Sequence, residues 1–162
     1  MFRGNNPASV DDKGRLKIPT AFKALLDEKY GQDLDFFVTS LDGKSVWVYP
    51  LPEWIKIEEQ LAPVVAGKEA SKEEKEQNKA ENKARKHFSD HTNYWGQMAR
   101  ADAQGRVLIP ALLRESAGMQ GEVAVMGQGK YLEVWSHEPL RESMALPFPE
   151  EYTDTLHSMG IR

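Results

Sequence analysis

The sequence predicts an α+β fold in which two similar halves, each a β-hairpin, a helix, a second β-hairpin and a second helix, are fused into one domain with internal pseudo-twofold symmetry. Three observations predict it: a nine-residue motif occurs twice, a strand-turn-strand pattern follows each copy, and proline and glycine bound short apolar-periodic stretches between them. The length of 162 residues suits one domain or two small halves. A half of about 50 ordered residues has too little core to be secure alone. We therefore expect two halves that interlock their apolar faces.

The repeated motif opens each half. Residues 11–19 read Asp-Asp-Lys-Gly-Arg-Leu-Lys-Ile-Pro, and residues 102–110 read Asp-Ala-Gln-Gly-Arg-Val-Leu-Ile-Pro, so five of nine positions are identical at an offset of 91. An aspartate at the first position of a tight turn can accept hydrogen bonds from backbone N–H groups ahead of it. A glycine at the fourth position supplies the positive φ that closes the turn. Asp11, Gly14, Asp102 and Gly105 are therefore interpreted as turn residues, which the fold needs whatever the protein does.

A short strand and a helix follow each turn. Alternation places Leu16 and Ile18 on one face of the first strand and Arg15 and Lys17 on the other. A proline then ends each strand, and an apolar-periodic stretch ends at a glycine, which is typical helix punctuation. The stretches are Pro19 to Gly31 in the first half and Pro110 to Gly118 in the second.

A β-hairpin and a second helix complete each half. The alternating residues predict hairpins over 36–40 with 45–49 and over 122–126 with 131–135, and helices over 52–61 and 139–144. Trp47, Tyr49, Trp54, Trp95 and Trp135 alternate with valines or lie nearby, which favours core packing over a platform for stacking bases.

A highly charged segment separates the halves. Residues 67–90 are rich in Lys and Glu and contain few apolar residues, which favours a solvated helix or a mobile linker. The alternative is a partner or DNA contact through Lys79, Lys83, Arg85 and Lys86. We expect a first unit over 1–66, a charged helical linker over 67–90, and a second unit with an acidic C-terminal end over 91–162.

Composition excludes several classes of function. The chain has no cysteine, so disulfides, thiolate metal sites and a cysteine nucleophile are excluded. No apolar run approaches the ~18 residues of a membrane span, and no secretory signal is visible, so we expect a cytoplasmic protein without membrane partners. The net charge is −4, but residues 1–23 carry +3 and residues 133–162 carry −4. This asymmetry suggests that a polyanion would meet the front of the chain.

The sequence offers little catalytic chemistry. His87 and His91 would share one helix face beside Asp90 as a metal pair, but no third ligand is implied. There is no Gly-rich phosphate loop and no nucleophile elbow. We therefore expect no enzyme, no cofactor, no metal and no small-molecule substrate.

Four segments together resemble the MraZ family of bacterial transcriptional regulators. They are the opening Met-Phe-Arg-Gly of residues 1–4, the two motif copies, and the string Tyr-Pro-Leu-Pro-Glu-Trp at 49–54. Either motif copy alone would indicate only the wider AbrB-like swapped-hairpin barrel. The charged stretch around 67–83 looks long for the family.

The resemblance implies two interlocked βαβ-type swapped-hairpin units per chain, which together form one pseudo-twofold barrel with peripheral helices, and a ring of chains. It also implies binding to short direct DNA repeats upstream of the division and cell-wall gene cluster, usually in the family's own operon, by a nucleoid-associated protein. The Asp-x-x-x-Arg motif of the family corresponds to Asp11 with Arg15 and to Asp102 with Arg106.

The two motif copies differ in charge. Lys13 and Lys17 of the first copy are replaced by Gln104 and Leu108 in the second. Our hypothesis is that the first copy faces DNA while the second serves the scaffold or a subunit contact. Arg15 would read a base edge or hold a phosphate, and Lys13 and Lys17 would contact phosphates.

Other interpretations stay open. Arg3, outside the motif, is a further candidate phosphate contact. Arg15 could instead pair with Asp11 or Asp12 and only brace the turn. The whole protein could also be an interaction scaffold that docks proteins through its acidic end, and a metal enzyme around His87 and His91 is a third class.

Overall fold

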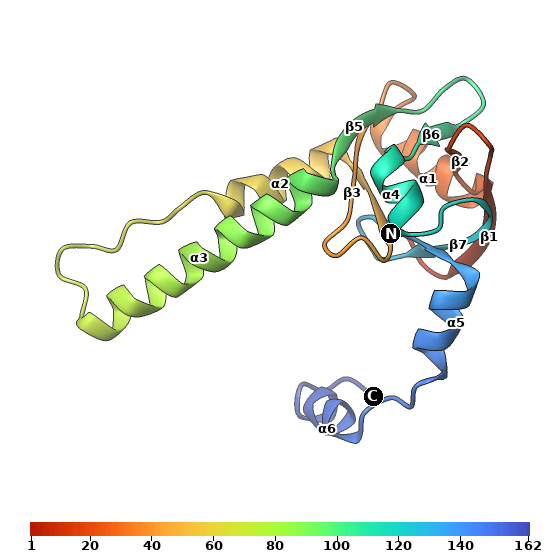
Figure 1. The fold of residues 1–162 in the computed structure, drawn as a ribbon. Coiled ribbons are helices and arrows are strands. Elements are labelled where there is room, and N and C mark those ends of the chain that lie inside the picture. The colour runs from red at the N-terminus through yellow and green to blue at the C-terminus, as the bar shows by residue number, and fades with distance from the viewer.

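Eight antiparallel strands form one sheet that rolls into a nearly closed barrel, and six helices lie outside it, in the computed structural model of residues 1–162 (Figure 1). The strands are β1 (Asn5–Val10), β2 (Arg15–Lys17), β3 (Asp35–Thr39), β4 (Val46–Pro50), β5 (Gln97–Arg100), β6 (Arg106–Leu108), β7 (Gly121–Gly127) and β8 (Leu132–Ser136). The helices are α1 (Thr20–Tyr30), α2 (Leu51–Leu61), α3 (Lys72–Trp95), α4 (Ala111–Ser116), α5 (His137–Ala145) and α6 (Glu150–Ser158).

The two halves of the chain exchange strands. The sheet order is β5-β3-β4-β8-β7-β1-β2-β6, and four of its seven pairings join a strand of the first half to one of the second. β1 pairs with β7 along its whole length, and β5 pairs with β3 in the same way. The backbone N–H of Asp102 donates to the carbonyl of Arg106 at 2.9 Å, which connects β5 to β6 and brings the ends of the order together. Exchanging the halves leaves this cyclic order unchanged, which confirms the predicted pseudo-twofold barrel.

The core lies inside the barrel and draws on both motif copies. Twenty buried apolar residues form one cluster, and it includes Leu16 and Ile18 from the first copy and Val107 and Ile109 from the second. Each of the four is no more than 2% exposed, whereas Lys17 is exposed and Arg15 is half-buried. The alternation predicted for the motif strand is therefore confirmed. Neither half encloses this core by itself, because each motif strand pairs with its counterpart from the other half.

The helices predicted from proline and glycine are present. α1 begins after Pro19 and ends at Gly31, whose φ of +81° is the left-handed region that favours glycine. α4 occupies the equivalent place in the second half but has only six residues. α2 and α5 cover the other two predicted spans. α6 was not predicted, and no helix of the chain is long and apolar enough to cross a membrane.

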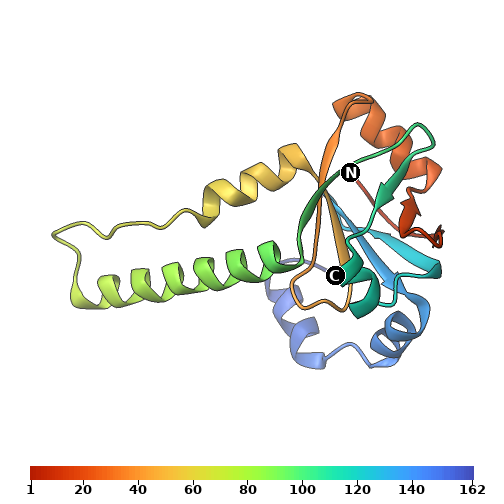
Figure 2. The same cartoon turned by 45° about the horizontal axis from the view of Figure 1, so that its top comes forward.

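α2, the loop after it and α3 form an arm that projects from the barrel (Figure 2). Ser71 and Glu74 make a reciprocal capping box at the start of α3, which stabilises the first turn of this 24-residue helix. α3 runs through the charged segment and on to Trp95, where it joins β5. Thr92 is its only buried residue, so most of the arm is solvated, as expected for such a charged sequence. The division into units over 1–66, 67–90 and 91–162 stays a prediction.

A second apolar cluster fixes the base of the arm to the barrel. It contains Phe37, Tyr49 and Trp54 as buried members, with Trp47 and Phe88 packed against them. The ring centroids of Phe37 and Trp54 lie 4.8 Å apart, and those of Trp54 and Phe88 lie 6.3 Å apart. These aromatic residues are therefore packed in the protein, as predicted, rather than displayed as a platform for bases.

Candidate nucleic-acid interface

The Asp11 carboxylate organises the first motif turn. Its Oδ1 accepts hydrogen bonds from the backbone N–H groups of Lys13 at 3.0 Å and Arg15 at 2.9 Å, and its Oδ2 accepts from Arg15 Nε at 2.8 Å. The backbone N–H of Gly14 donates to the Asp11 carbonyl at 2.9 Å, and the φ of Gly14 is +82°. The turn therefore has the chemistry that its sequence predicts.

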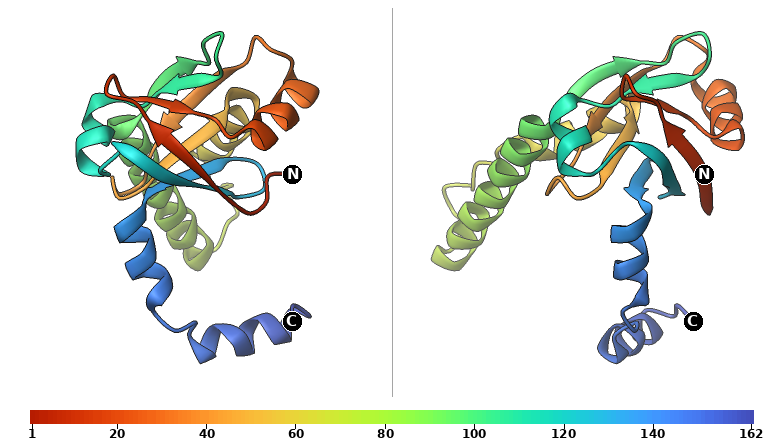
Figure 3. Two further views of the ribbon diagram at one scale, coloured as in Figure 1. Left: turned by 90° about the vertical axis from the view of Figure 1, so that its right-hand side faces the viewer. Right: turned by 45° about the vertical axis from the view of Figure 1, so that its right-hand side comes forward.

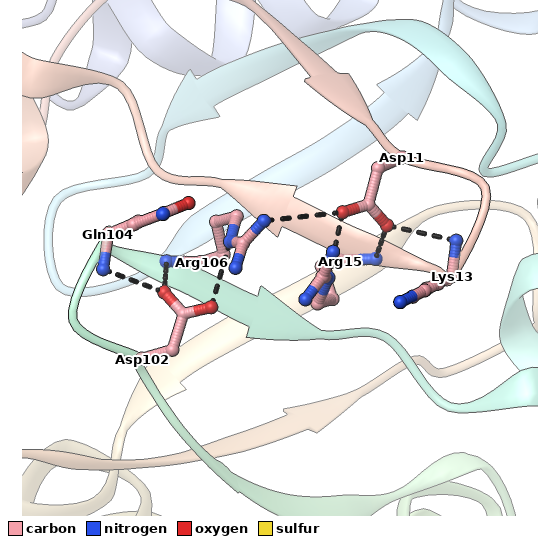
Figure 4. A network of polar contacts seen from close by, with 6 residues as sticks. All are labelled: Asp11, Lys13, Arg15, Asp102, Gln104 and Arg106. Carbon is pink, nitrogen blue, oxygen red and sulfur yellow. Dashed lines mark hydrogen bonds and ion pairs between the residues drawn. The ribbon is translucent and has the colours of Figure 1, made fainter.

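The second turn repeats this geometry. Asp102 Oδ1 accepts from the backbone N–H groups of Gln104 and Arg106, both at 2.9 Å, and Oδ2 accepts from Arg106 Nε at 2.8 Å (Figure 4). The pKa values of Asp11 and Asp102 lie below the ordinary aspartate value, chiefly because the backbone N–H of Arg15 or Arg106 donates to each carboxylate. Both carboxylates are thus held ionised beside an arginine.

The barrel brings the two turns together on one outer face. In the β2–β6 pair, Arg15 lies opposite Leu108, and Lys17 lies opposite Arg106. Because Leu16 and its partner Val107 point inward, these four residues share the outward face of the ribbon. We call this surface, with the turns that flank it, the motif ridge.

Backbone and side-chain contacts join the two copies. The N–H of Ile18 donates to the Gly105 carbonyl at 3.1 Å, and the N–H of Ile109 donates to the Gly14 carbonyl at 2.9 Å. Arg106 Nη1 lies 3.8 Å from Asp11 Oδ2, so the first carboxylate is shared by both motif arginines (Figure 4). The two motif copies are therefore neighbours on one surface. The hypothesis that the first copy faces DNA while the second serves the scaffold depends only on their different side chains, and it stays a hypothesis.

Arg15 braces the turn without using all its donors. Nε bonds to Asp11, while the two Nη groups donate no hydrogen bond within the chain, and the side chain is 31% exposed. Arg15 thus does pair with Asp11 and stabilise the turn, but its guanidinium group is held in place with free donors. Such a group suits bidentate contacts to guanine or phosphate.

The other predicted DNA contacts lie at different distances from the ridge. Lys13 occupies the exposed turn, and Lys17 is exposed on β2. Arg3 lies just before β1, whereas the turn lies just after it, so roughly 25 Å of extended chain separates Arg3 from the turn. The structure therefore does not bring Arg3 together with the other three.

Two basic residues beside the ridge escaped the sequence prediction. The side chain of Lys23 on α1 covers Gly105, and the side chain of Arg114 on α4 covers Gly14. Lys23 is paired with Asp27. The signal was in the sequence, because Lys23 and Arg114 are also separated by the repeat offset of 91. The repeat thus places one cation over the glycine of each opposite turn.

The charged arm carries fewer free cations than its composition suggests. Arg85 donates to the Gln60 carbonyl at 3.1 Å and to Asn82, and Lys86 is paired with Asp90. Lys79 and Lys83 remain exposed. His87 and His91 line one groove on α3, and no group of three or more potential metal-ligating side chains is assembled in the chain.

The chain matches the family model described as "MraZ protein, putative antitoxin-like" over residues 1–84 and 97–142. It belongs to the MraZ family. It is 46% identical to the transcriptional regulator MraZ of Acidobacterium capsulatum over 162 residues, which cover 99% of this chain and all of that protein. It is 42% identical to the regulator of the same name from Koribacter versatilis over the same shares, and 34% identical over 138 residues to that of Leuconostoc citreum, with 85% and 82% covered.

Membership of the MraZ family makes the chain a transcriptional regulator and not an enzyme, as the sequence predicts. The two motif copies that carry the resemblance are the two turns of the motif ridge. The site residues themselves stay predictions.

Proposed function

We propose that the protein binds double-stranded DNA specifically through the motif ridge and controls transcription at short direct repeats. The observation that carries this is the shared outward face of β2 and β6, where Arg15 keeps free donors beside Lys17 and Arg106. Arg15 would read a base edge or hold a phosphate. Lys13, Lys17 and the more distant Arg3 would contact phosphates. The resemblance implies the target, which is DNA upstream of the division and cell-wall gene cluster, in the promoter of the gene for this protein. The protein would therefore act at the nucleoid in the cytoplasm.

The charges of the ridge favour many weak contacts over one strong one. A single chain presents few cations, so its affinity for DNA should be weak, and its log affinity should fall with log salt by about one unit per phosphate contact. Linked binding sites raise the effective concentration of each next contact. A ring of chains would therefore convert several weak ridges into tight binding of a repeat array.

A head-to-tail ring also fits the symmetry of the target. Heterologous interfaces repeat one surface in one direction, whereas a twofold dimer presents surfaces in opposite directions and matches palindromes. Direct repeats therefore favour the ring. The number of chains is left to measurement by light scattering.

Fluorescence anisotropy tests the proposal on DNA from upstream of the gene for this protein, over a salt series. Wild type should bind a direct-repeat array tightly, and Arg15→Ala should lose most of this binding while remaining folded. Arg141→Ala on α5 is the matched control, because this exposed arginine is also paired with an acid, Glu138 at 2.6 Å. Equal weak binding to scrambled repeats would overturn the proposal.

An interaction scaffold is the second candidate. It is favoured by one observation, the C-terminal segment, which combines acidic residues with exposed apolar side chains and whose last helix, α6, lies away from the barrel (Figure 3). Binding that ignores DNA sequence, together with a bound protein partner, would support this function.

A further inference from the structure

Helix α3 carries a row of lysines along one side. Lys72, Lys75, Lys79, Lys83 and Lys86 recur at intervals of three or four residues. Residues at this spacing lie one above the other on the same face of a helix. All five side chains are exposed. At 1.5 Å per residue, the row from Lys72 to Lys83 is about 16 Å long.

Four of these lysines have no partner within the chain. Lys86 is paired with Asp90. None of the other four lies within 4 Å of a carboxylate or donates a side-chain hydrogen bond. We call these four residues the lysine stripe: Lys72, Lys75, Lys79 and Lys83. The stripe therefore presents four unpaired positive charges to solvent.

The acids of α3 leave this face largely positive. Glu76 is beside the stripe, four residues after Lys72 and three before Lys79, but it pairs with neither. At 100° per residue, the other acids between 72 and 86 lie more than 100° around the helix from the middle of the stripe. These acids are Glu73, Glu74 and Glu81. Like charges are thus grouped on one side of α3 rather than alternating around it.

Contacts on a neighbouring side of α3 hold the arm and leave the lysines free. The side-chain amides of Asn78 and Asn82 donate to the Val64 carbonyl at 2.9 Å and 2.7 Å. Arg85 Nε donates to the Gln60 carbonyl at 3.1 Å. Each of these three residues directly precedes a lysine, and successive residues of a helix point about 100° apart. The side facing α2 and its loop is therefore fixed, and the lysines point away from it.

The chemistry of the stripe fits a polyanion better than a protein surface. Between Lys72 and Lys86, the residues on this face are all charged, so a partner helix would find no apolar surface to bury there. Lysine is a compact charge that contacts phosphate without fixed geometry. A transcriptional regulator acts on DNA, which is a polyanion with one negative charge per ~1.7 Å of helix axis.

We propose that the lysine stripe binds the sugar–phosphate backbone of double-stranded DNA outside the repeat that the motif ridge contacts. The arm points away from the β2–β6 ribbon, so the two surfaces would meet different stretches of DNA (Figures 1 and 2). Contacts to phosphate carry no base information, so binding by the stripe would be independent of sequence. The inference rests on the DNA binding of the proposed function, but not on Arg15 or on the repeats.

Fluorescence anisotropy with two duplexes tests the contact. One duplex ends at the repeat array, and the other extends the same array at each end by about 15 base pairs of unrelated sequence, more than the ~36 Å of α3 can span. Wild type should bind the longer duplex at least tenfold more tightly at ~50 mM salt. The slope of log affinity against log salt should be steeper by about 0.9 for each lysine engaged. Equal wild-type affinities for the two duplexes would overturn the inference.

Replacing all four stripe lysines by glutamine removes the charge and keeps a similar helix propensity. This variant should lose the gain from the longer duplex and should bind the shorter one within twofold of wild type. Replacing the same four by arginine keeps the charge and should keep the gain. Equal losses in the glutamine and arginine variants would mean that the lysines act through the fold, which would overturn the inference.

A pair of double variants separates the stripe from net charge. Lys79→Gln with Lys83→Gln and Lys44→Gln with Arg141→Gln remove the same charge, and Lys44 and Arg141 are exposed outside the arm. The first pair should reduce the gain from the longer duplex severalfold, and the second should change it less than twofold. Equal reductions would refute a local contact.

Two further outcomes separate this inference from its alternatives. Wild type that ignores the repeats, while the glutamine variant binds every long duplex more weakly, would refute the proposed repeat recognition and support the stripe. Light scattering should show the same assembly for both chains. A smaller assembly of the glutamine variant, with its gain from the longer duplex unchanged, would mean that the stripe holds an acidic segment of a second copy and would overturn the inference.

Discussion

The glycines of the two motif turns have similar backbones but different neighbours, so the same substitution should cost different amounts. The φ angles are +82° at Gly14 and +73° at Gly105. A Cβ added at Gly14 would lie 2.2 Å from Nη1 and 2.3 Å from Cδ of Arg114. A Cβ at Gly105 would meet Lys23 Cε at 3.6 Å, an ordinary contact. Only Gly14→Ala therefore forces a neighbouring side chain to move.

The two costs can be worked separately. A left-handed conformation costs an L-residue roughly 1–2 kcal/mol, and alanine recovers roughly 0.4–1 kcal/mol through the unfolded chain. Gly105→Ala should therefore lower the free energy of unfolding by about 1 kcal/mol. Displacing the Arg114 side chain adds roughly 1–2 kcal/mol, by analogy with overpacking. The total for Gly14→Ala is about 2–3 kcal/mol, or a fall in Tm of roughly 4–12 °C for a chain of this size.

Urea denaturation at fixed protein concentration measures both variants, with the slope m compared to confirm that only stability has changed. The double variant Gly14→Ala with Arg114→Ala isolates the steric part. Removing the Arg114 side chain first should make Gly14→Ala cost about as much as Gly105→Ala, which appears as a favourable coupling of roughly 1–2 kcal/mol. Equal costs for the two single variants, or no coupling in the cycle, would refute the reasoning.

Three further predictions concern charge. Because folding lowers the pKa values of Asp11 and Asp102, their contribution to stability is complete above the ordinary value of 3.8 and is lost as pH falls through the lowered values. Asp11→Asn should therefore lose less of its free energy of unfolding than wild type does below about pH 5, as measured by acid unfolding. Glu53 is 4% exposed and accepts hydrogen bonds from donors on α1 and α2. Glu53→Ala should therefore lower the free energy of unfolding, measured in urea, by roughly 1–3 kcal/mol. An effect below about 0.5 kcal/mol would show that these hydrogen bonds do not stabilise the fold. Lys17→Ala should weaken DNA binding and reduce the magnitude of the slope of log affinity against log salt by about 1, whereas Leu108→Lys should strengthen binding and steepen the slope. The same change in DNA affinity from both substitutions would contradict a difference between the motif copies.

The repeat made most of the barrel predictable. Two turns with the same Asp and Gly positions imply two similar hairpins, and the alternation around Leu16 assigns the inward face. The pairing of Lys17 with Arg106 could not be predicted in the same way, because β2 and β6 pair over a separation of about 90 residues. Local periodicity carries no information about such a register.

The sequence predicts a solvated helix or a mobile linker over 67–90, but it does not predict α6. The order of α3 depends on a capping box at Ser71 and Glu74, a local signal that favours the helix. α6 follows a Leu-Pro-Phe-Pro string and carries acids between its apolar residues, so it resembled an acidic end rather than a helix. A helix that buries nothing within its own chain has no packing pattern to complete, which is why a single sequence reveals it poorly.

The carboxylates of the motif ridge would help the protein to distinguish DNA from other polyanions. The motif ridge contains four positive charges, from Lys13, Lys17 and the two motif arginines, and three negative charges, from Asp11, Asp12 and Asp102. Its net charge is therefore only +1. A surface with so little net charge attracts phosphate weakly at long range. The aspartates instead fix the two guanidinium groups in orientation, which favours contacts that depend on geometry. Under the proposed function, discrimination would come from this orientation and affinity from repetition around the ring, so disassembly should weaken binding to the array far more than binding to a single repeat.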